Sequence, residues 1–273
     1  LQVVQDHAAF QTPLFPESYE AVIKAPLAQP LRIAFTTDSP VGTPVSAAAK
    51  AAVDKVAKWF AAQGHHVEEA QPPIDGKQLM RDYFLMNSGE IAALMTNVEK
   101  QLGRTITADD VEIETWLLYR AGLQVSAVAF SQSLIAWDLA AEQMALFHDT
   151  YDIYLTPTTA YPAPKIGELT KSEAEATALR EQVEKLDALG QQELIYDMFL
   201  PSLTYTPFTQ LANLTGQPAI SLPVHITDAN LPLGVQMVAR KGKEHLLLQL
   251  AYQLEQTSLW VHVRDYMDTF FAS

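Results

Sequence analysis

The chain has 273 residues, of which 48% are hydrophobic and 18% are charged, so we expect one large or two small globular domains with a sizeable core. Its 32 acidic residues outnumber the 18 lysines and arginines and give a net charge of −14, which argues against a nucleic-acid partner. The absence of cysteine excludes disulfides, thiolate metal ligands and a cysteine nucleophile.

The same composition bears on location. No apolar stretch approaches the roughly 18 residues that a membrane span requires, so no membrane partner is expected. A chain without cysteine is compatible with the cytoplasmic location that we expect. The chain begins with Leu1 rather than methionine, which fits an excised or processed fragment better than a natural start.

The first elements predict a βαβ unit. A strand is expected over residues 31–36, a helix over residues 45–63 and a returning strand over residues 65–69, with Gly64 ending the helix. The unit contains no glycine-rich phosphate-binding motif. A scaffold role is therefore favoured over a nucleotide site.

A helical block follows over residues 78–149. We expect one helix over residues 79–101, a second starting at Thr107 with Asp110 as its capping-box partner, and a long third helix over residues 125–148. No internal repeat of solenoid length is visible in the chain.

Strands and helices alternate again after this block. A strand is expected over residues 151–155, followed by a proline-rich link. Ser172 and Glu175 form a second predicted capping box, which opens a charged helix that ends near Gly190. The last predicted elements are a helix at 208–215 ended by Gly216, strands at 219–223 and 233–239 separated by a turn at 228–232, and an amphipathic helix at 244–256. Such alternation predicts an α/β fold whose sheet is covered by helices.

The residue pattern alone gives no complete catalytic site. Ser221 lies within a predicted strand without a nucleophile elbow, so a structural role is favoured for it. His148, Asp149 and Asp152 are close in sequence, but they span a helix end and a strand start, where capping is favoured over metal binding. Lys165 follows two prolines and is interpreted as a surface charge. We therefore predict no metal site, no cofactor and no catalytic residue within this sequence.

Four segments resemble the amidase signature family. They read LRIAF, AAAKAAVDKVAKWFAAQGHHVEE, YDIYLTPTTAYPAPKIGEL and NLTGQPAISLPV, and the most specific is the last, at residues 213–224. In this segment a helix stopped by Gly216 is expected to turn into a central strand at Pro218. The resemblance implies an α/β fold with a mixed sheet flanked by helices.

The resemblance also implies how the chain is organised. Residues 1–30 would form an N-terminal connecting segment. Residues 31–273 would form the C-terminal part of an amidase signature domain, with a helical insertion at about residues 78–150. Because this part is cut from a shared sheet, an edge and an apolar surface would be left uncovered, and we expect the fragment to be a homo-oligomer.

Enzymes of this family hydrolyse carboxamides with a lysine, a bridging serine in a cis peptide and a nucleophilic serine, the two serines lying in a glycine-serine loop. This chain has 11 glycines and no two are adjacent, so it lacks that loop. The resemblance therefore places the catalytic residues in an N-terminal half outside this sequence. It predicts that the isolated chain is inactive, and that the full-length protein acts on a small-molecule amide.

The matched part would contribute walls of the substrate pocket. The candidates for substrate binding are Thr158, at the end of a strand, and Tyr205, Thr206 and Phe208, which precede the NLTG turn. For each of these residues, plain packing is an equally good interpretation.

Two branches of the family and one other class of protein remain open. The A subunit of the tRNA-dependent amidotransferase carries an aspartate where Thr206 stands, which argues against glutamine specificity here. The residues of these motifs are more similar to those of the branch that contains 6-aminohexanoate-cyclic-dimer hydrolases and general amidases. The alternative class is a non-catalytic binding or regulatory module built on the same scaffold.

Overall fold

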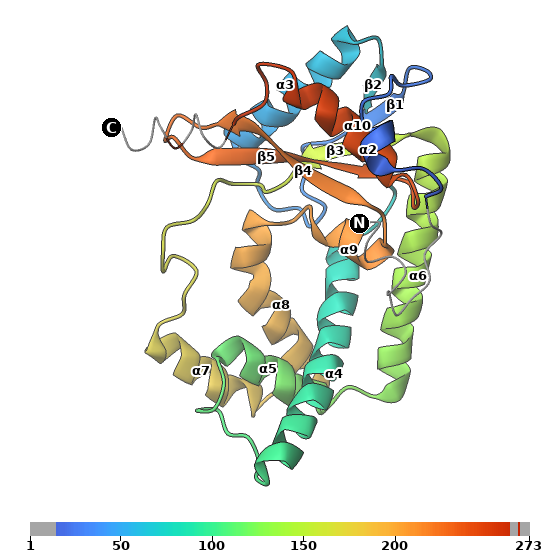
Figure 1. Ribbon diagram of the computed structural model, residues 1–273. Coiled ribbons are helices and arrows are strands. Elements are labelled where there is room, and N and C mark those ends of the chain that lie inside the picture. The colour runs from blue at the N-terminus through green and yellow to red at the C-terminus, as the bar shows by residue number, and fades with distance from the viewer. Residues whose placement is uncertain (1–14, 263–266, 268–273) are drawn as a thin grey trace. The chain divides into compact units, whose positions relative to one another are not determined.

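The computed structural model describes residues 15–262 and residue 267 (Figure 1). The chain divides into two compact units. Among the described residues, the first unit comprises those up to Pro73, Ala141–Ala163 and those from Tyr205 onward, and the second comprises Ile74–Ala140 and Pro164–Thr204. Of the connecting segment expected at residues 1–30, residues 1–14 lie outside the described residues, and the remainder includes the short helix α2 (Tyr19–Val22).

The first unit contains a mixed five-stranded sheet, which confirms the predicted fold class. The strand order is β2-β1-β3-β5-β4. Strands β1, β2 and β3 are parallel, whereas β5 is antiparallel to both β3 and β4. The strands span β1 Arg32–Phe35, β2 His66–Glu69, β3 Ile153–Pro157, β4 Ala219–Ile226 and β5 Pro232–Ala239.

The predicted βαβ unit is confirmed. Strand β1 leads through helix α3 (Ala47–Ala62) to the parallel strand β2. The Ser46 hydroxyl accepts a hydrogen bond from the backbone N–H of Ala49 and so caps the start of α3. Gly64 follows the helix with a φ of 89°, a backbone conformation that residues with a side chain rarely adopt. It therefore ends the helix as expected.

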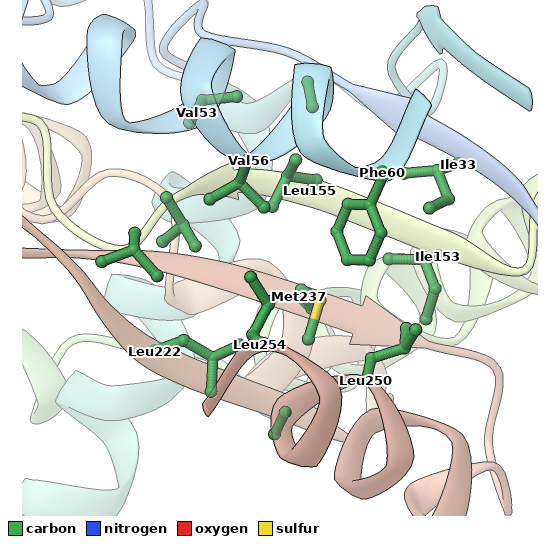
Figure 2. Packing of buried hydrophobic residues seen from close by; sticks show 14 of the residues in the cluster. Ile33, Val53, Val56, Phe60, Ile153, Leu155, Leu222, Met237, Leu250 and Leu254 are labelled. Carbon is green, nitrogen blue, oxygen red and sulfur yellow. The ribbon is translucent and has the colours of Figure 1, made fainter. Parts of the chain in front are cut away.

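The core of this unit lies between the sheet and helices α3 and α10 (Glu244–Glu255). Figure 2 shows Phe60 of α3 close to Ile33 and Ile153, and Leu250 and Leu254 of α10 close to Met237. These side chains are fully buried, and each contributes about 1.5–3 kcal/mol relative to an exposed position. The last helix is amphipathic, as predicted, and the apolar residues on its inner face are buried: Leu247, Leu250, Ala251 and Leu254.

The short helix before β4 is also confirmed, but the position of the strand is not. Helix α9 (Gln210–Thr215) ends at Gly216, whose φ is 79°. Figure 1 shows α9 on the face of the sheet opposite to α3 and α10. The strand after Pro218 was expected to be central, yet β4 is an edge strand of the described sheet because it pairs with β5 alone.

Helices make up the second unit. They are α4 (Gly76–Leu102), α5 (Ile113–Gly122), the first part of α6 (Ala127–Thr150), α7 (Glu173–Val183) and most of α8 (Ala188–Tyr205). The capping box of Ser172 and Glu175 at the start of α7 is present, with both reciprocal hydrogen bonds formed.

Two helix boundaries in this unit were predicted wrongly. The segment at Thr107 is a turn, and α5 starts only at Ile113. Asp110 accepts hydrogen bonds from the backbone N–H and hydroxyl of Thr107 and from both terminal nitrogens of Arg104, and these bonds hold its pKa far below the usual range. The carboxylate therefore closes a loop instead of capping a helix. Gly190 does not end a helix either, since it lies inside α8.

Candidate functional site

The candidate site lies at the carboxyl end of β3, where the parallel half of the sheet meets the antiparallel strand β5. In α/β sheets, the region beyond the carboxyl ends of parallel strands is the usual place for ligands, because loops and free backbone groups gather there. Thr158, the first predicted wall residue, stands directly after β3. Its backbone N–H donates to the carbonyl of Gly234 at 3.0 Å, which fixes it against β5.

Thr158 is joined to Ser221, which the sequence had placed in a structural role. The two hydroxyl oxygens are 2.7 Å apart, although Thr158 follows β3 and Ser221 lies within β4, 63 residues later in the sequence. Ser221 is exposed and Thr158 is half-buried. One proton of the pair is used between them, so the other can be donated to a ligand.

Gly234 leaves the space in which these hydroxyls meet. A Cβ atom on this residue would lie 2.9 Å from the Ser221 hydroxyl oxygen and 3.1 Å from both the Thr158 hydroxyl oxygen and the Leu222 carbonyl. A glycine inside a strand is typical of a place where other groups approach the backbone closely. Here the absent side chain makes room for the Thr158–Ser221 pair.

The other three predicted residues lie on one segment that crosses the same unit. The carbonyl of Tyr205 accepts a hydrogen bond from the Ala160 backbone N–H at 2.8 Å, and its ring lies 5.4 Å from that of Tyr161. Phe208 is buried, with 4% of its surface exposed. Thr206 lies between them and is half-buried.

A buried glutamine connects this segment with β3. The side-chain Nε2 of Gln236 donates to the Phe208 carbonyl at 3.2 Å and to the Thr156 hydroxyl at 3.3 Å. In the sheet register, Gln236 stands opposite both Thr156 on β3 and Ser221 on β4, so the three side chains share one face. The structure thus brings Thr158 and Phe208 into one network, with Ser221, Gly234 and Gln236 between them.

This network contains hydroxyl, amide and aromatic groups and no carboxylate, lysine, arginine or histidine. It can donate and accept hydrogen bonds and can exclude water from a bound group. Nucleophilic catalysis by one of these hydroxyls would also require a neighbouring base, and none of the groups in this network is a base.

The three residues His148, Asp149 and Asp152 have structural partners. His148 Nδ1 lies 2.9 Å from the Tyr151 carbonyl, Asp149 pairs with Arg240 at 2.6 Å, and Asp152 accepts the backbone N–H of Arg32 at 2.8 Å. Burial lowers the pKa of His148. Within residues 15–262, no group of three or more His, Cys, Asp or Glu side chains is arranged to hold a metal ion.

Sequence reasoning missed Gly234 and Gln236, although both leave a signal. Gly234 is a glycine within a predicted strand, and Gln236 is a polar residue in the otherwise apolar run LGVQMVA. Their partners could not be read from the chain, because pairing joins strands about 80 residues apart.

Comparison with known proteins decides the family. The family model described as Amidase matches residues 3–248. The chain belongs to the amidase signature family. Among the described residues, none of the helices is long and apolar enough to cross a membrane.

Two curated relatives match most of the chain. The lipoamidase of Enterococcus faecalis is 38% identical over 260 residues, which are 93% of this chain and 34% of that protein. The 6-aminohexanoate-cyclic-dimer hydrolase of Paenarthrobacter ureafaciens is 33% identical over 235 residues, or 85% of this chain and 45% of that protein. The chain therefore spans between a third and a half of the length of these relatives.

A solved structure agrees with the described fold. The structure of 6-aminohexanoate cyclic dimer hydrolase complexed with substrate superposes with a TM-score of 0.76 at 30% identity. The match covers 90% of this chain and 49% of that protein. The α/β fold with a mixed sheet is thus shared with a family member, as the resemblance implied.

Proposed function

We propose that this chain supplies the C-terminal part of an amide hydrolase whose catalytic residues lie in an N-terminal part outside this sequence. The observation that carries the proposal is the coverage: relatives match 85–93% of this chain, while the match covers only 34–45% of their own length. The sequence also lacks adjacent glycines, and so lacks the loop that holds the two serines in the family. In this reading the isolated chain does not hydrolyse amides.

The role of this part would be to bind and orient the substrate. Thr158, with its partner Ser221, would donate a hydrogen bond to a polar atom of the amide substrate. Tyr205, Thr206 and Phe208 would form an opposing wall that keeps water from the acyl group. Holding the amide in a reactive orientation lowers the entropy cost of the step carried out by the lysine and two serines.

The chemistry of this network favours neutral amides. A site selective for free glutamine needs an acidic group to pair with the substrate ammonium, and Thr206 stands where the amidotransferase subunit has aspartate. The similarity to a lipoamidase and to a 6-aminohexanoate-cyclic-dimer hydrolase points to the same class, since these names record amides rather than amino acids. We therefore propose linear or cyclic aliphatic amides as substrates.

The test compares the chain alone with a reconstituted enzyme. The chain would be co-expressed with the N-terminal half of the Paenarthrobacter hydrolase. The assay would measure the free amino groups formed when 6-aminohexanoate cyclic dimer is opened, and the ammonia released from lipoamide and from glutamine. We expect no turnover by either half alone, turnover of the neutral amides by the pair, and little activity on glutamine.

Three outcomes would contradict the proposal. Turnover by the isolated chain would reveal a catalytic site within this sequence. A preference for glutamine would reject the substrate class. Binding of amides without turnover in any combination of halves, including the natural upstream sequence, would favour a non-catalytic binding module instead.

A further inference from the structure

Gln236 is a buried polar residue whose bonds reach both sides of the candidate site. Only 5% of its surface is exposed, and both protons of its Nε2 are used, one by the Phe208 carbonyl and one by the Thr156 hydroxyl. These two bonds fix the orientation of the carboxamide, because the flipped amide would place Oε1 against the Phe208 carbonyl oxygen.

The bond to Thr156 continues toward Thr158. Since the Thr156 hydroxyl accepts from Gln236, its own proton is free to be donated, and it goes to the carbonyl of Pro157 at 2.9 Å. That carbonyl belongs to the peptide that joins Pro157 to Thr158. A single carboxamide is thus connected on one side to the backbone carrying Thr158, and on the other to the backbone carrying Phe208.

From this geometry we infer that Gln236 is a positioning residue for the substrate-binding walls of the proposed amide hydrolase. The expected effect of Gln236 on catalysis rests on the proposed function. Its expected effect on the local structure rests on the hydrogen bonds alone. Gln236 itself contacts two groups of the chain, and it acts on a ligand through Thr158 and through the segment at residues 205–208. Its loss would leave a buried carbonyl and a buried hydroxyl without their donor, which makes local opening of that segment easier.

The chain offers a matched control in Gln249 of α10. This glutamine is also buried, with 7% of its surface exposed, and its Nε2 also donates two bonds, at 3.2 Å each, to the carbonyls of Val22 and Ala25. It lies in the same unit and anchors the segment around helix α2. Replacing either glutamine with methionine removes the same kind of donor and keeps a similar volume.

The first measurement is hydrogen exchange on the chain itself. In Gln236→Met we expect the backbone N–H groups of Thr206, Phe208 and Thr209 to exchange about tenfold faster, while residues 19–25 keep their wild-type rates. In Gln249→Met we expect the reverse pattern. Equal exchange of residues 206–209 in the wild type and in Gln236→Met would overturn the inference, as would equally faster exchange of that segment in Gln249→Met.

The second measurement uses the reconstituted enzyme and two neutral amides that differ in acyl length. In Gln236→Met we expect kcat/KM to fall about tenfold for the longer amide and to change less for the shorter one, because a displaced wall affects contacts along the acyl chain. Gln249→Met should leave the ratio of the two values unchanged. An unchanged ratio in Gln236→Met would show that the residue is merely structural. Failure of the proposed function would appear differently, as no turnover by the wild type or either variant, with the difference in exchange still present.

Discussion

Replacing Gly122 with alanine should strongly destabilise the helical unit. Gly122 is the last residue of α5, and a Cβ atom built on it would lie 1.9 Å from the Ser88 carbonyl oxygen and 2.7 Å from the Ala92 Cβ, both on α4. Real Cβ atoms essentially never approach another atom within 3.0 Å, so the two helices would have to separate by at least 1.1 Å, the difference between 3.0 and 1.9 Å. The obstacle is backbone, which has no other rotamer to adopt.

The expected cost is about 3 kcal/mol, the upper part of the range for overpacking, because the shift also loosens the contacts of neighbouring side chains. For a chain of this size, the free energy of unfolding falls by about 3 kcal/mol per molar urea. The urea concentration at the unfolding midpoint should therefore fall by about 1 M. Circular dichroism at increasing urea concentration measures it.

The control is Gly103→Ala, where φ is 66° and no atom lies within 4 Å of the added Cβ. Backbone strain without crowding should cost only about 1 kcal/mol there. If Gly122→Ala lowers the free energy of unfolding no more than Gly103→Ala does, then Gly122 is not needed for the close contact between α5 and α4.

Three further predictions concern the candidate site, pH and association. In the reconstituted enzyme, Gly234→Ala should lower kcat/KM for neutral amides about tenfold, because the added Cβ would crowd the Thr158–Ser221 pair; wild-type kinetics would show that this space is not used. The pKa of His148 is lowered from 6.5 mainly by burial, so its neutral form stabilises the folded state above pH 6.5 and this contribution is lost as the pH falls. The urea midpoint should accordingly drop less between about pH 7 and pH 5 in His148→Gln than in the wild type, and equal drops would contradict the assignment. We also propose that the chain self-associates through an apolar stripe on the part of α6 in the second unit, formed by side chains that are 57–67% exposed: Val128, Ile135 and Leu139. Light scattering with size exclusion at about 100 µM should show dimers or larger species for the wild type. The double variant Ile135→Glu and Leu139→Glu should be a monomer, and a monomeric wild type would refute the proposed self-association.

Local patterns predicted the elements whose stability is local. Helix α3 has its Ser46 cap, its stop at Gly64 and apolar positions on one face, and each of these is visible within a short window of sequence. Helix α7 likewise shows its capping box directly. In such elements the backbone bonds and the buried face are specified by neighbours in the chain.

Prediction failed where a residue can serve two structures equally well. Thr107 and Asp110 have the spacing of a capping box, but the carboxylate is held by Arg104 and closes a turn. Helix α8 was not predicted, since it contains Pro201 and no clear polar face. In both places the outcome depends on contacts that a window of sequence does not contain.

The residues that connect distant parts of this fold are those that break the pattern of their own element. Gly234 interrupts an apolar strand where two hydroxyls meet above it. Gln236 is a buried amide among apolar neighbours, where its cost in desolvation is offset by partners from β3 and from the segment before α9. A local propensity rule counts both residues against the strand that contains them. Because an unfavourable local choice persists only where a tertiary contact compensates for it, such positions in a sequence can be read as places where another segment approaches, even though the sequence does not say which segment that is.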